Sequence, residues 1–260
     1  MIGYLIGYAI TLVSFFSLFY IVAQIKHDNS IVDVGWGIGF VVLAWDSFIY
    51  QVVTAELSIL QIVVTSLVTL WGVRLFLHIG IRNFKKPEDY RYKQMREKWS
   101  NPLVEAFFKV FMTQAFMMLL VSAPILAAYT NEASNTVPLW MIITGGVIFL
   151  IGFFFEAVGD YQLRQFIKHE KEEGEIMTGG LWRYTRHPNY FGETVQWWGL
   201  WVIVLLSTYG IAAVISPLLI TYLLLFVSGI PLLEKRYKDN EAFQKYAKKT
   251  SIFFPLPPKE

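Results

Sequence analysis

Residues 179–209 read GGLWRYTRHPNYFGETVQWWGLWVIVLLSTY, and in this stretch a polar half leads directly into an apolar half. The polar half holds two arginines, a histidine, an asparagine, two tyrosines and a glutamate, and the apolar half runs from Thr194 to Tyr209. Ionisable side chains at the mouth of a membrane segment are costly to remove from water, so their default interpretation is a functional site. The stretch therefore indicates a membrane helix that begins at a site.

Comparable apolar runs recur along the whole chain. Of its 260 residues, 55% are hydrophobic and 16% are charged, whereas about 25% of an average soluble domain is charged. A spanning helix needs roughly 20 apolar residues. The runs that approach or exceed this length are 2–25, 31–50, 57–80, 103–129, 137–159, 190–207 and 210–233. The sequence thus predicts an all-α polytopic membrane helix bundle of about seven transmembrane helices.

The distribution of lysine and arginine predicts the orientation of this bundle. Seven spanning helices would place on one side the loops Lys26–Ser30, Arg82–Pro102 and Asp160–Asn189, together with the tail from Glu234. All 22 Lys and Arg residues lie in these segments or in the helices that flank them, and the opposite loops contain none. By the positive-inside rule we expect the N-terminus outside and the C-terminus in the cytoplasm.

We expect residues 1–260 to form a single integral-membrane domain, because the loops between the runs are too short to fold alone. The first run has no basic region before it and no Ala-x-Ala-like site after it, which favours a spanning helix over a cleavable signal peptide. The segment 171–175 (KEEGE) is typical of a solvated turn. No Walker motif, His-Glu-x-x-His or other metal-binding spacing occurs, so no metal site is predicted.

A polar stripe begins near the end of the fifth apolar run and continues beyond it. Glu156, Asp160, Arg164 and Lys168 are four residues apart, so a helix would place them on one face. The structural alternative is a ladder of ion pairs on a solvated face, each worth a few tenths of a kcal/mol. Because the two carboxylates follow directly on an apolar run, we interpret the stripe as one wall of a cofactor cleft.

The quoted stretch supplies a second group of candidates. Arg183 and Arg186 carry planar guanidinium groups suited to bidentate phosphate contacts. The proline that follows His187 disfavours helical geometry there, so the chain should turn at this point. Asn189 could cap the helix that follows, and Glu193 could complement its dipole.

A third group surrounds the second and third runs. His78 and Arg82 would share one helix face, and a charged juxtamembrane segment with Tyr92 follows them. Ser30 and Asp33 resemble a capping box at the start of the second helix, which is a sufficient structural explanation for both. The closely spaced glycines at 35–39 have no preceding strand, so they favour tight helix contact over dinucleotide binding.

The motif GLWRYTRHPNYFGE (180–193), preceded by DYQLR (160–164), resembles the C-terminal signature of the steroid 5-alpha-reductase family, and more closely a broad bacterial branch of it. The shorter core Arg-His-Pro-x-Tyr is shared with isoprenylcysteine carboxyl methyltransferases, which have a related fold and bind S-adenosylmethionine. The resemblance is strong over the last two-fifths of the chain and extends over the rest as a matching helix pattern.

This resemblance implies a seven-helix reductase that reduces a conjugated double bond with NADPH, held in a cavity open to the cytoplasm. Residues 1–130 would then be the substrate-side helices and 137–260 the cofactor-binding region. The pair Arg82-Asn83 stands where the family has an Asn-Arg pair near the cofactor. The family's His-Tyr-x-x-Arg in the third helix reads LWGVR at 70–74. The tyrosine that would polarise a steroid carbonyl is therefore missing, which argues against a steroid substrate.

The motifs and the resemblance together predict a membrane oxidoreductase that reduces a carbon–carbon double bond of a lipid, sterol-like, isoprenoid or unsaturated acyl, by hydride transfer from NADPH. The predicted cofactor-binding residues are Asp160, Arg164, Arg183, Tyr184, Arg186, His187, Asn189, Glu193, Arg82 and Asn83. The candidates for the proton donor are His78, Tyr92 and Asp33.

Two alternatives remain open. A lipid or isoprenoid methyltransferase that uses S-adenosylmethionine would fit the Arg-His-Pro core, although the polar stripe is the more reductase-like feature. A transporter or lipid-binding protein is disfavoured, because the ionisable residues gather at one face and do not mark a path across the bilayer. We expect a lipid substrate, no nucleic acid, no obligate protein partner, and a bacterial inner membrane with the cofactor site facing the cytoplasm.

Overall fold

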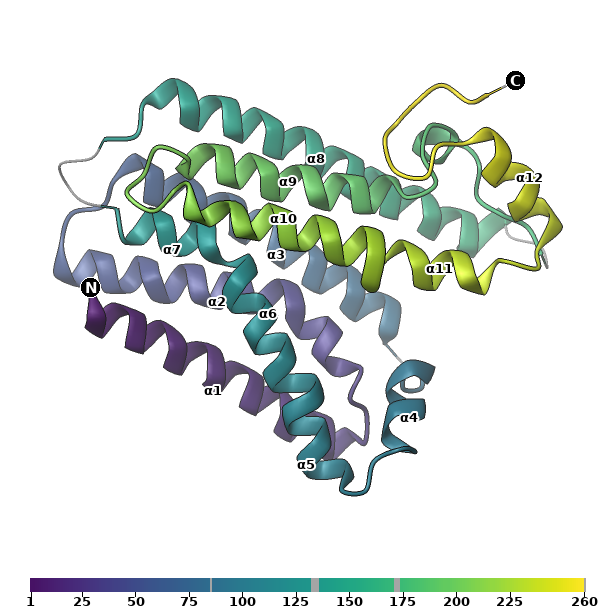
Figure 1. Ribbon diagram of the computed structural model, residues 1–260, viewed down its shortest axis with the longest axis horizontal. Coiled ribbons are helices and arrows are strands. Elements are labelled where there is room, and N and C mark those ends of the chain that lie inside the picture. The colour runs from purple at the N-terminus through teal and green to yellow at the C-terminus, as the bar shows by residue number, and fades with distance from the viewer. Residues whose placement is uncertain (85, 132–135, 171–173, 260) are drawn as a thin grey trace. The chain divides into compact units, whose positions relative to one another are not determined.

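A computed structural model describes residues 1–84, 86–131, 136–170 and 174–259, and the regular elements in this part of the chain are all helical, as predicted. The contacts within the chain divide it into two compact units, and Figure 1 labels the helices that build them. Unit 1 comprises Met1–Val137 and Val204–Ala213, and unit 2 comprises Pro138–Ile203 and Val214–Glu260. That the whole chain forms a single domain stays a prediction. The predicted turn at 171–175 lies mostly outside the described residues.

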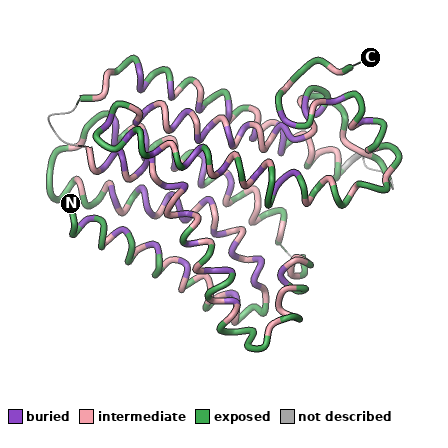
Figure 2. Tube along the Cα trace, in the orientation of Figure 1, coloured by how far each residue is buried: buried purple, intermediate pink, exposed green. Residues whose placement is uncertain are grey.

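Unit 1 is built on three long helices, α1 (Ile2–Lys26), α2 (Ile31–Thr54) and α3 (Ile59–Asn83). A short helix, α4 (Tyr90–Arg96), follows α3. The fourth apolar run forms a series of shorter helical segments: α5 (Pro102–Ala106), the π-helix η1 (Phe107–Met112), α6 (Thr113–Val121) and α7 (Ala123–Tyr129). Buried residues recur about every four positions along α1, on the side that faces α2 (Figure 2).

The prediction of one continuous helix over 103–129 is wrong at Ser122. The helix stops there because Pro124, in the first turn of α7, has no backbone N–H to continue the hydrogen-bond ladder. The hydroxyl of Ser122 instead donates to the carbonyl of Leu119 at 2.9 Å. The chain restarts as α7 after this break.

Two sequence predictions about α2 have different outcomes. The predicted tight contact is confirmed at Gly37, where an added Cβ would lie 2.6 Å from the carbonyl oxygen of Gly72 on α3. The predicted capping box is wrong, because the hydroxyl of Ser30 donates to Oδ1 of Asp28 at 2.6 Å and makes no cap bond. Asp33 bonds instead with side chains of the α4 segment.

Unit 2 contains two long helices, α8 (Leu139–Gln165) and α9 (Pro188–Val204), separated by the π-helix η2 (Phe166–Glu170) and the 3-10 helix η3 (Gly180–Arg183). The last apolar run begins with the 3-10 helix η4 (Ala212–Val214). It continues through α10 (Ile215–Tyr222), the π-helix η5 (Leu223–Val227) and α11 (Ile230–Arg236). A short amphipathic helix, α12 (Glu241–Lys249), follows it.

Glycines bring the backbones of α8 and α9 into direct contact. A Cβ added at Gly145 would lie 2.6 Å from the carbonyl oxygen of Gly199, and one added at Gly152 would lie 2.5 Å from that of Gly192. Each pair is seven residues, about two helical turns, from the next. The two helices therefore run antiparallel along the apolar part of α8 with no side chain between them at these points.

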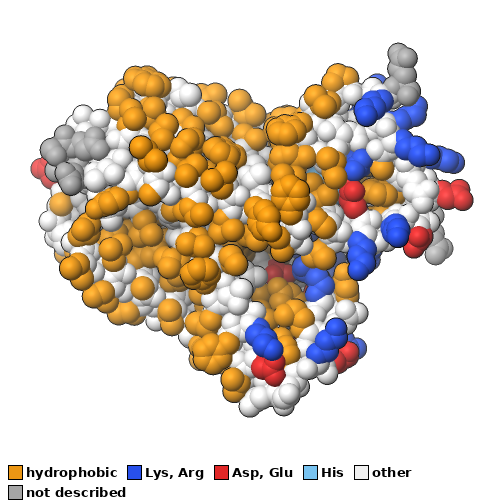
Figure 3. Space-filling model, in the orientation of Figure 1, with side chains coloured by type: hydrophobic (Ala, Val, Ile, Leu, Met, Phe, Trp, Pro, Cys, Tyr) orange, Lys and Arg blue, Asp and Glu red, His pale blue; other side chains and the backbone are white. Residues whose placement is uncertain are grey.

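Six helical stretches in the described part of the chain are long and apolar enough to cross a membrane, which indicates an integral membrane protein. They are Ile2–Lys26, Ile31–Thr54, Ile59–Asn83, Pro102–Val121, Leu139–Lys168 and Ala212–Arg236. The sixth predicted run is the one missing from this set, because α9 has only 17 residues. Large apolar side chains cover much of the outward surface of the helices (Figure 3).

Candidate functional site

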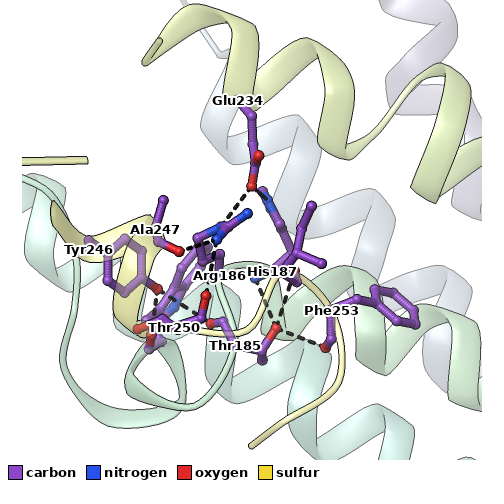
Figure 4. A network of polar contacts seen from close by, with 10 residues as sticks. Thr185, Arg186, His187, Glu234, Tyr246, Ala247, Thr250 and Phe253 are labelled. Atoms are coloured by element: carbon purple, nitrogen blue, oxygen red, sulfur yellow. Dashed lines mark hydrogen bonds and ion pairs between the residues drawn. The ribbon is translucent and has the colours of Figure 1, made fainter. Parts of the chain in front are cut away.

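A polar network at the start of α9 joins three segments of unit 2 (Figure 4). Oε1 of Glu234, on α11, accepts a hydrogen bond from Nε of Arg186 at 2.8 Å and lies 3.2 Å from Nε2 of His187. Both partners precede α9, whose first residue is Pro188. The predicted turn before the proline is thus observed, and it places two adjacent side chains on one carboxylate.

Arg186 also holds the segment that follows α12. Its Nη1 donates to the carbonyl oxygens of Ala247 at 2.8 Å and Thr250 at 3.0 Å, and its backbone N–H donates to that of Ser251 at 2.8 Å. The guanidinium is therefore largely committed to acceptors of its own chain. A phosphate contact from this side chain stays a prediction.

His187 is 4% exposed, and this burial lowers the pKa of its imidazole below the usual value, although the hydrogen bond to Glu234 opposes the shift. Its ring stacks on that of Tyr190 at a centroid distance of 5.6 Å. With the carboxylate of Glu234 accepting, Nε2 carries the proton in the neutral ring and Nδ1 is the acceptor. Nδ1 has no hydrogen-bond partner among the described residues. The ring is therefore an oriented, neutral group near neutral pH.

A second set of bonds fixes the η3 segment beneath this network. The hydroxyl of Tyr246, on α12, donates to the carbonyl oxygen of Trp182, and the indole N–H of Trp182 donates to that of Gly159 at 3.1 Å. Burial raises the pKa of Tyr246. The hydroxyl of Thr185 donates to the carbonyl oxygen of Phe253 at 2.8 Å. These bonds connect α8, η3, α12 and the chain end into one framework.

A pocket of about 120 Å³ opens beside the network. Aromatic rings form much of its wall, and its polar lining includes Arg186, His187 and Glu234. Both contacts of the Glu234 carboxylate described above use Oε1, so Oε2 is its remaining acceptor. The lining residues are Leu163, Phe166, Ile167, Glu175, Ile176, Met177, Trp182, Arg186, His187, Leu233, Glu234, Tyr237, Phe243 and Tyr246. The pocket therefore combines aromatic walls with a carboxylate in its lining.

The two carboxylates of the predicted polar stripe are buried against α9. Nδ2 of Asn189 donates to Oδ1 of Asp160 at 3.0 Å, and Nε2 of Gln196 donates to Oε2 of Glu156 at 2.5 Å. Arg164 is exposed and lies over the ring of Tyr161. The stripe is therefore divided between a buried half and an exposed half.

Asn189 does not cap α9, contrary to the prediction, because the helix already begins at Pro188. Its Oδ1 accepts from the backbone N–H of Tyr190 at 3.0 Å, while its amide reaches Asp160. Among the other predicted cofactor residues of unit 2, Arg183 and Tyr184 are exposed and Glu193 is half-buried. None of these three lines the pocket.

The remaining predicted site residues lie in unit 1. The hydroxyl of Tyr92 donates to Oδ1 of Asp33 at 2.6 Å, and Nη2 of Arg91 lies 3.3 Å from Oδ2 of the same carboxylate. Burial, with the charge of Asp33, raises the pKa of Tyr92 well above its usual value. His78 is half-buried on α3, and Nε of Arg82 donates to Oδ1 of Asn83 at 3.2 Å. Two of the three proton-donor candidates thus form one pair.

Sequence reasoning missed Glu234, Tyr246 and Gln196. Glu234 ends an apolar run among basic residues, so by pattern it is ordinary interfacial charge. Tyr246 belongs to a short helix with three lysines and resembles a solvated segment. Their partners are 40 to 64 residues away, and local spacing carries no signal at that range. The position of Glu234, three residues after a proline in the first turn of a helix, was the one available hint.

The family described as "Protein of unknown function (DUF1295)" matches residues 19–250. The chain belongs to this family. This assignment places most of both units within a single family match. No solved structure matches the chain.

More distant similarity connects this DUF1295 chain to two kinds of enzyme. It is 30% identical to 3-oxo-5-alpha-steroid 4-dehydrogenase 1 of Bos taurus, over 44% of this chain and 41% of that protein. It is 32% identical to steroid 5-alpha-reductase DET2 of Arabidopsis thaliana, over 28% of this chain and 27% of that protein. It is also 29% identical to the probable O-methyltransferase ustE of Ustilaginoidea virens, over 40% of this chain and 37% of that protein. The matches thus span less than half the length of each relative.

Proposed function

We propose that this protein is a polytopic membrane reductase that transfers a hydride from NADPH to a carbon–carbon double bond of a lipid. The similarity to steroid 5-alpha-reductases of animals and plants carries the proposal. The missing tyrosine in the third helix, where Trp71 stands, favours a lipid other than a steroid. In the net reaction one carbon of the double bond takes the hydride and its neighbour takes a proton.

The pocket of unit 2 fits one end of a nucleotide. Its volume of about 120 Å³ is similar to that of an engineered apolar cavity of roughly 150 Å³ that holds benzene. It therefore has room for one ring system, and Trp182, Phe243 and Tyr246 offer aromatic walls for it. Oε2 of Glu234 would accept a hydrogen bond from a ribose hydroxyl or an amide N–H of the ligand.

The phosphates of the cofactor would need cations other than Arg186. Arg164 and Arg183 are exposed, and each is adjacent in sequence to a residue that lines the pocket, Leu163 and Trp182. We therefore assign the phosphate contacts to these two guanidinium groups, whose planar forks suit them. NADPH, when bound, supplies the hydride itself, and the protein supplies orientation and electrostatics.

Tyr92 is our candidate for the proton donor. Its phenol is protonated at neutral pH, and its hydrogen bond to Asp33 orients the hydroxyl. Nη2 of Arg91 lies 3.3 Å from the other oxygen of that carboxylate. To act as a general acid, the hydroxyl would exchange its bond to Asp33 for one to the substrate before it gives up its proton. His78 and Asp33 stay the alternatives.

We further propose that α9 is a seventh membrane span. Its contacts with α8 at Gly199 and Gly192 fall along the apolar part of that helix, which supports the same depth for both. Seven spans place the two termini on opposite sides of the membrane, and the positive-inside rule then puts the C-terminus in the cytoplasm. The site of unit 2 would face the cytoplasm, where nucleotide cofactors are found.

Ligand-dependent thermal unfolding of the purified protein in detergent tests the proposal. We expect NADPH to raise the melting temperature, because a ligand that binds the folded state stabilises it by mass action. Arg164→Ala and Arg183→Ala should weaken this shift, while Lys98→Ala, which removes an exposed cation of unit 1 with no neighbour in the pocket lining, serves as the control. Arg186→Ala is unsuitable because it removes bonds that hold the framework.

A methyltransferase that uses S-adenosylmethionine is the second candidate. The similarity to ustE favours it, and so does the commitment of Arg186 to internal acceptors, because S-adenosylmethionine carries no phosphate. A thermal shift with S-adenosylmethionine and none with NADPH would replace the reductase proposal by this one. A shift that is unaffected by Arg164→Ala and Arg183→Ala would refute our assignment of the phosphate contacts.

A further inference from the structure

The segment after α12, residues 250–258, is strapped to the start of the site by backbone bonds. The backbone N–H of Arg186 donates to the carbonyl oxygen of Ser251 at 2.8 Å, and that of Leu256 donates to the carbonyl oxygen of Tyr184 at 3.0 Å. We call residues 250–258 the strap. These bonds hold it extended beside residues 184–186.

Side chains alternate along the strap between the interior and the surface. Phe253 is 5% exposed and packs edge-on against Phe191 at a centroid distance of 5.7 Å. Its neighbours on the other face are exposed, with Ile252 at 45%, Phe254 at 64% and Leu256 at 54%. Period-two alternation of this kind is the geometry of an extended chain. The strap thus presents three large apolar side chains outward, beside the first turns of α9.

A basic face lies next to this apolar row. Lys245, Lys248 and Lys249 are exposed and are spaced three and four residues apart, so they share one face of α12. The backbone N–H of Lys259 donates to the carbonyl oxygen of Lys249 at 2.8 Å, which adds a fourth exposed lysine. Figure 3 shows Lys and Arg side chains gathered over this end of unit 2.

The opposite face of α12 belongs to the pocket. Phe243 and Tyr246 line it, and Tyr246 is bonded to the carbonyl of Trp182. At 100° per residue, Phe243 lies on the side of the helix away from the three lysines, and Tyr246 lies between that side and Lys249. One short helix therefore carries a pocket wall on one side and a cluster of cations on the other.

We propose that the lysine face of α12 and the apolar row of the strap form a docking surface for the anionic phospholipid headgroups of the bilayer. Cations beside large apolar side chains match an interface where phosphates adjoin acyl chains. The ring of Phe254 lies 6.2 Å from that of Phe191, in the first turn of α9, which puts the row at the end of an apolar helix. Headgroup binding would hold α12, and with it one wall of the pocket, in place.

This inference does not depend on which cofactor the pocket takes. Its test is the binding of phosphatidylglycerol to the whole protein in a nonionic detergent. The lipid is titrated, and binding is measured as the change in melting temperature. Phosphatidylcholine is the neutral reference lipid, and inorganic phosphate is the reference for a soluble anion. We expect phosphatidylglycerol to bind with clear preference over both.

The decisive variant is K245Q/K248Q/K249Q, which should weaken phosphatidylglycerol binding by about tenfold or more, since each basic residue near an anionic surface contributes to attraction. K245R/K248R/K249R keeps the charge and should keep the affinity. K86Q/K93Q/K98Q removes three exposed lysines of unit 1 and should leave the affinity within about twofold. The double variant Ile252→Ser with Phe254→Ser should weaken the binding of phosphatidylglycerol but should not change the response of the melting temperature to inorganic phosphate.

Three results would overturn the proposal. The first is phosphatidylglycerol binding that survives K245Q/K248Q/K249Q. The second is an equal loss in K86Q/K93Q/K98Q, which would indicate general attraction by net charge. The third is an equal stabilisation by inorganic phosphate, which would identify a soluble anion as the ligand.

Discussion

Nε2 of His187 lies 3.2 Å from Oε1 of Glu234, a residue 47 positions further along the chain. The same oxygen accepts from Nε of Arg186. One carboxylate oxygen thus joins α11 to the turn before α9, and we propose that the second oxygen binds the ligand. A single side chain would then couple the stability of the fold to ligand binding.

Glu234→Gln should destabilise the protein and weaken the binding of its ligand. The substitution keeps the size of the side chain but removes the charge that Arg186 and His187 share. Hydrogen bonds to charged groups contribute about 1.5–3 kcal/mol, and we expect a loss in that range in the free energy of unfolding. Glu241→Gln, at an exposed position of α12, should change it by less than about 0.5 kcal/mol. Equal effects of the two variants would argue against the role of Glu234.

His187 should make stability depend on acidity. Burial lowers its pKa from the usual 6.5, an effect that the hydrogen bond to Glu234 partly offsets. Below pH 6.5 the unfolded state therefore binds more protons than the folded state, and unfolding is favoured. We expect this group to have no effect on stability above pH 6.5, and the free energy of unfolding to fall as the pH drops from 6.5 toward the folded-state pKa.

The measurement is the melting temperature from neutral to mildly acidic pH. His187→Gln should flatten this part of the profile. His27→Asn is the control, because His27 is exposed and has a left-handed φ of 54° that asparagine tolerates. If the slope persists in His187→Gln, another group is responsible for it.

Gly152→Ala should force α8 and α9 apart. Its Cβ would lie 2.5 Å from the carbonyl oxygen of Gly192, so backbone must shift, and overpacking of this kind costs about 1–3 kcal/mol. Gly146→Ala, on the same helix, places a Cβ with nothing within 4 Å. That variant should be neutral or gain up to about 1 kcal/mol. Thermal unfolding distinguishes the two, and equal behaviour would contradict the close contact.

The termini should lie on opposite sides of the membrane. Seven spans predict this result, whereas six spans would leave both termini on the same side. Tags at each end, probed by protease in sealed vesicles of known orientation, provide the measurement. A C-terminal tag protected together with an N-terminal tag would exclude α9 as a span.

Tyr92→Phe should slow the reaction without equal loss of substrate affinity. Removing a general acid costs about 10²–10⁴-fold in rate, and the effect should appear in kcat. Tyr90→Phe is the matched control, since Tyr90 is 53% exposed and begins the same short helix. If kcat falls by less than about tenfold in Tyr92→Phe, Tyr92 is not the proton donor, and His78 becomes the candidate.

Apolar run length was a sufficient guide to most of the helices, because the length of a spanning segment is set by the bilayer and not by its neighbours. It failed where local chemistry intervened, as at Pro124, which divides the fourth run, and at Ser30, whose hydroxyl bonds to Asp28. Asp160 and Asn189 were both predicted as site residues, and so were Asp33 and Tyr92. In the structure Asp160 is hydrogen-bonded to Asn189, and Asp33 to Tyr92. These pairings depend on tertiary packing, which the spacing of residues in a single sequence does not reveal.

The glycine contacts of α8 and α9 also have a consequence for the lipid around them. With 17 residues, α9 is about 26 Å long, whereas the hydrocarbon core of a bilayer is about 30 Å thick. Tilting would shorten the reach of such a helix further, so the adjustment to a span of this length falls to the surrounding lipid. As the seventh span that we propose, α9 would favour local thinning of the bilayer on its flank, and so membranes of smaller thickness.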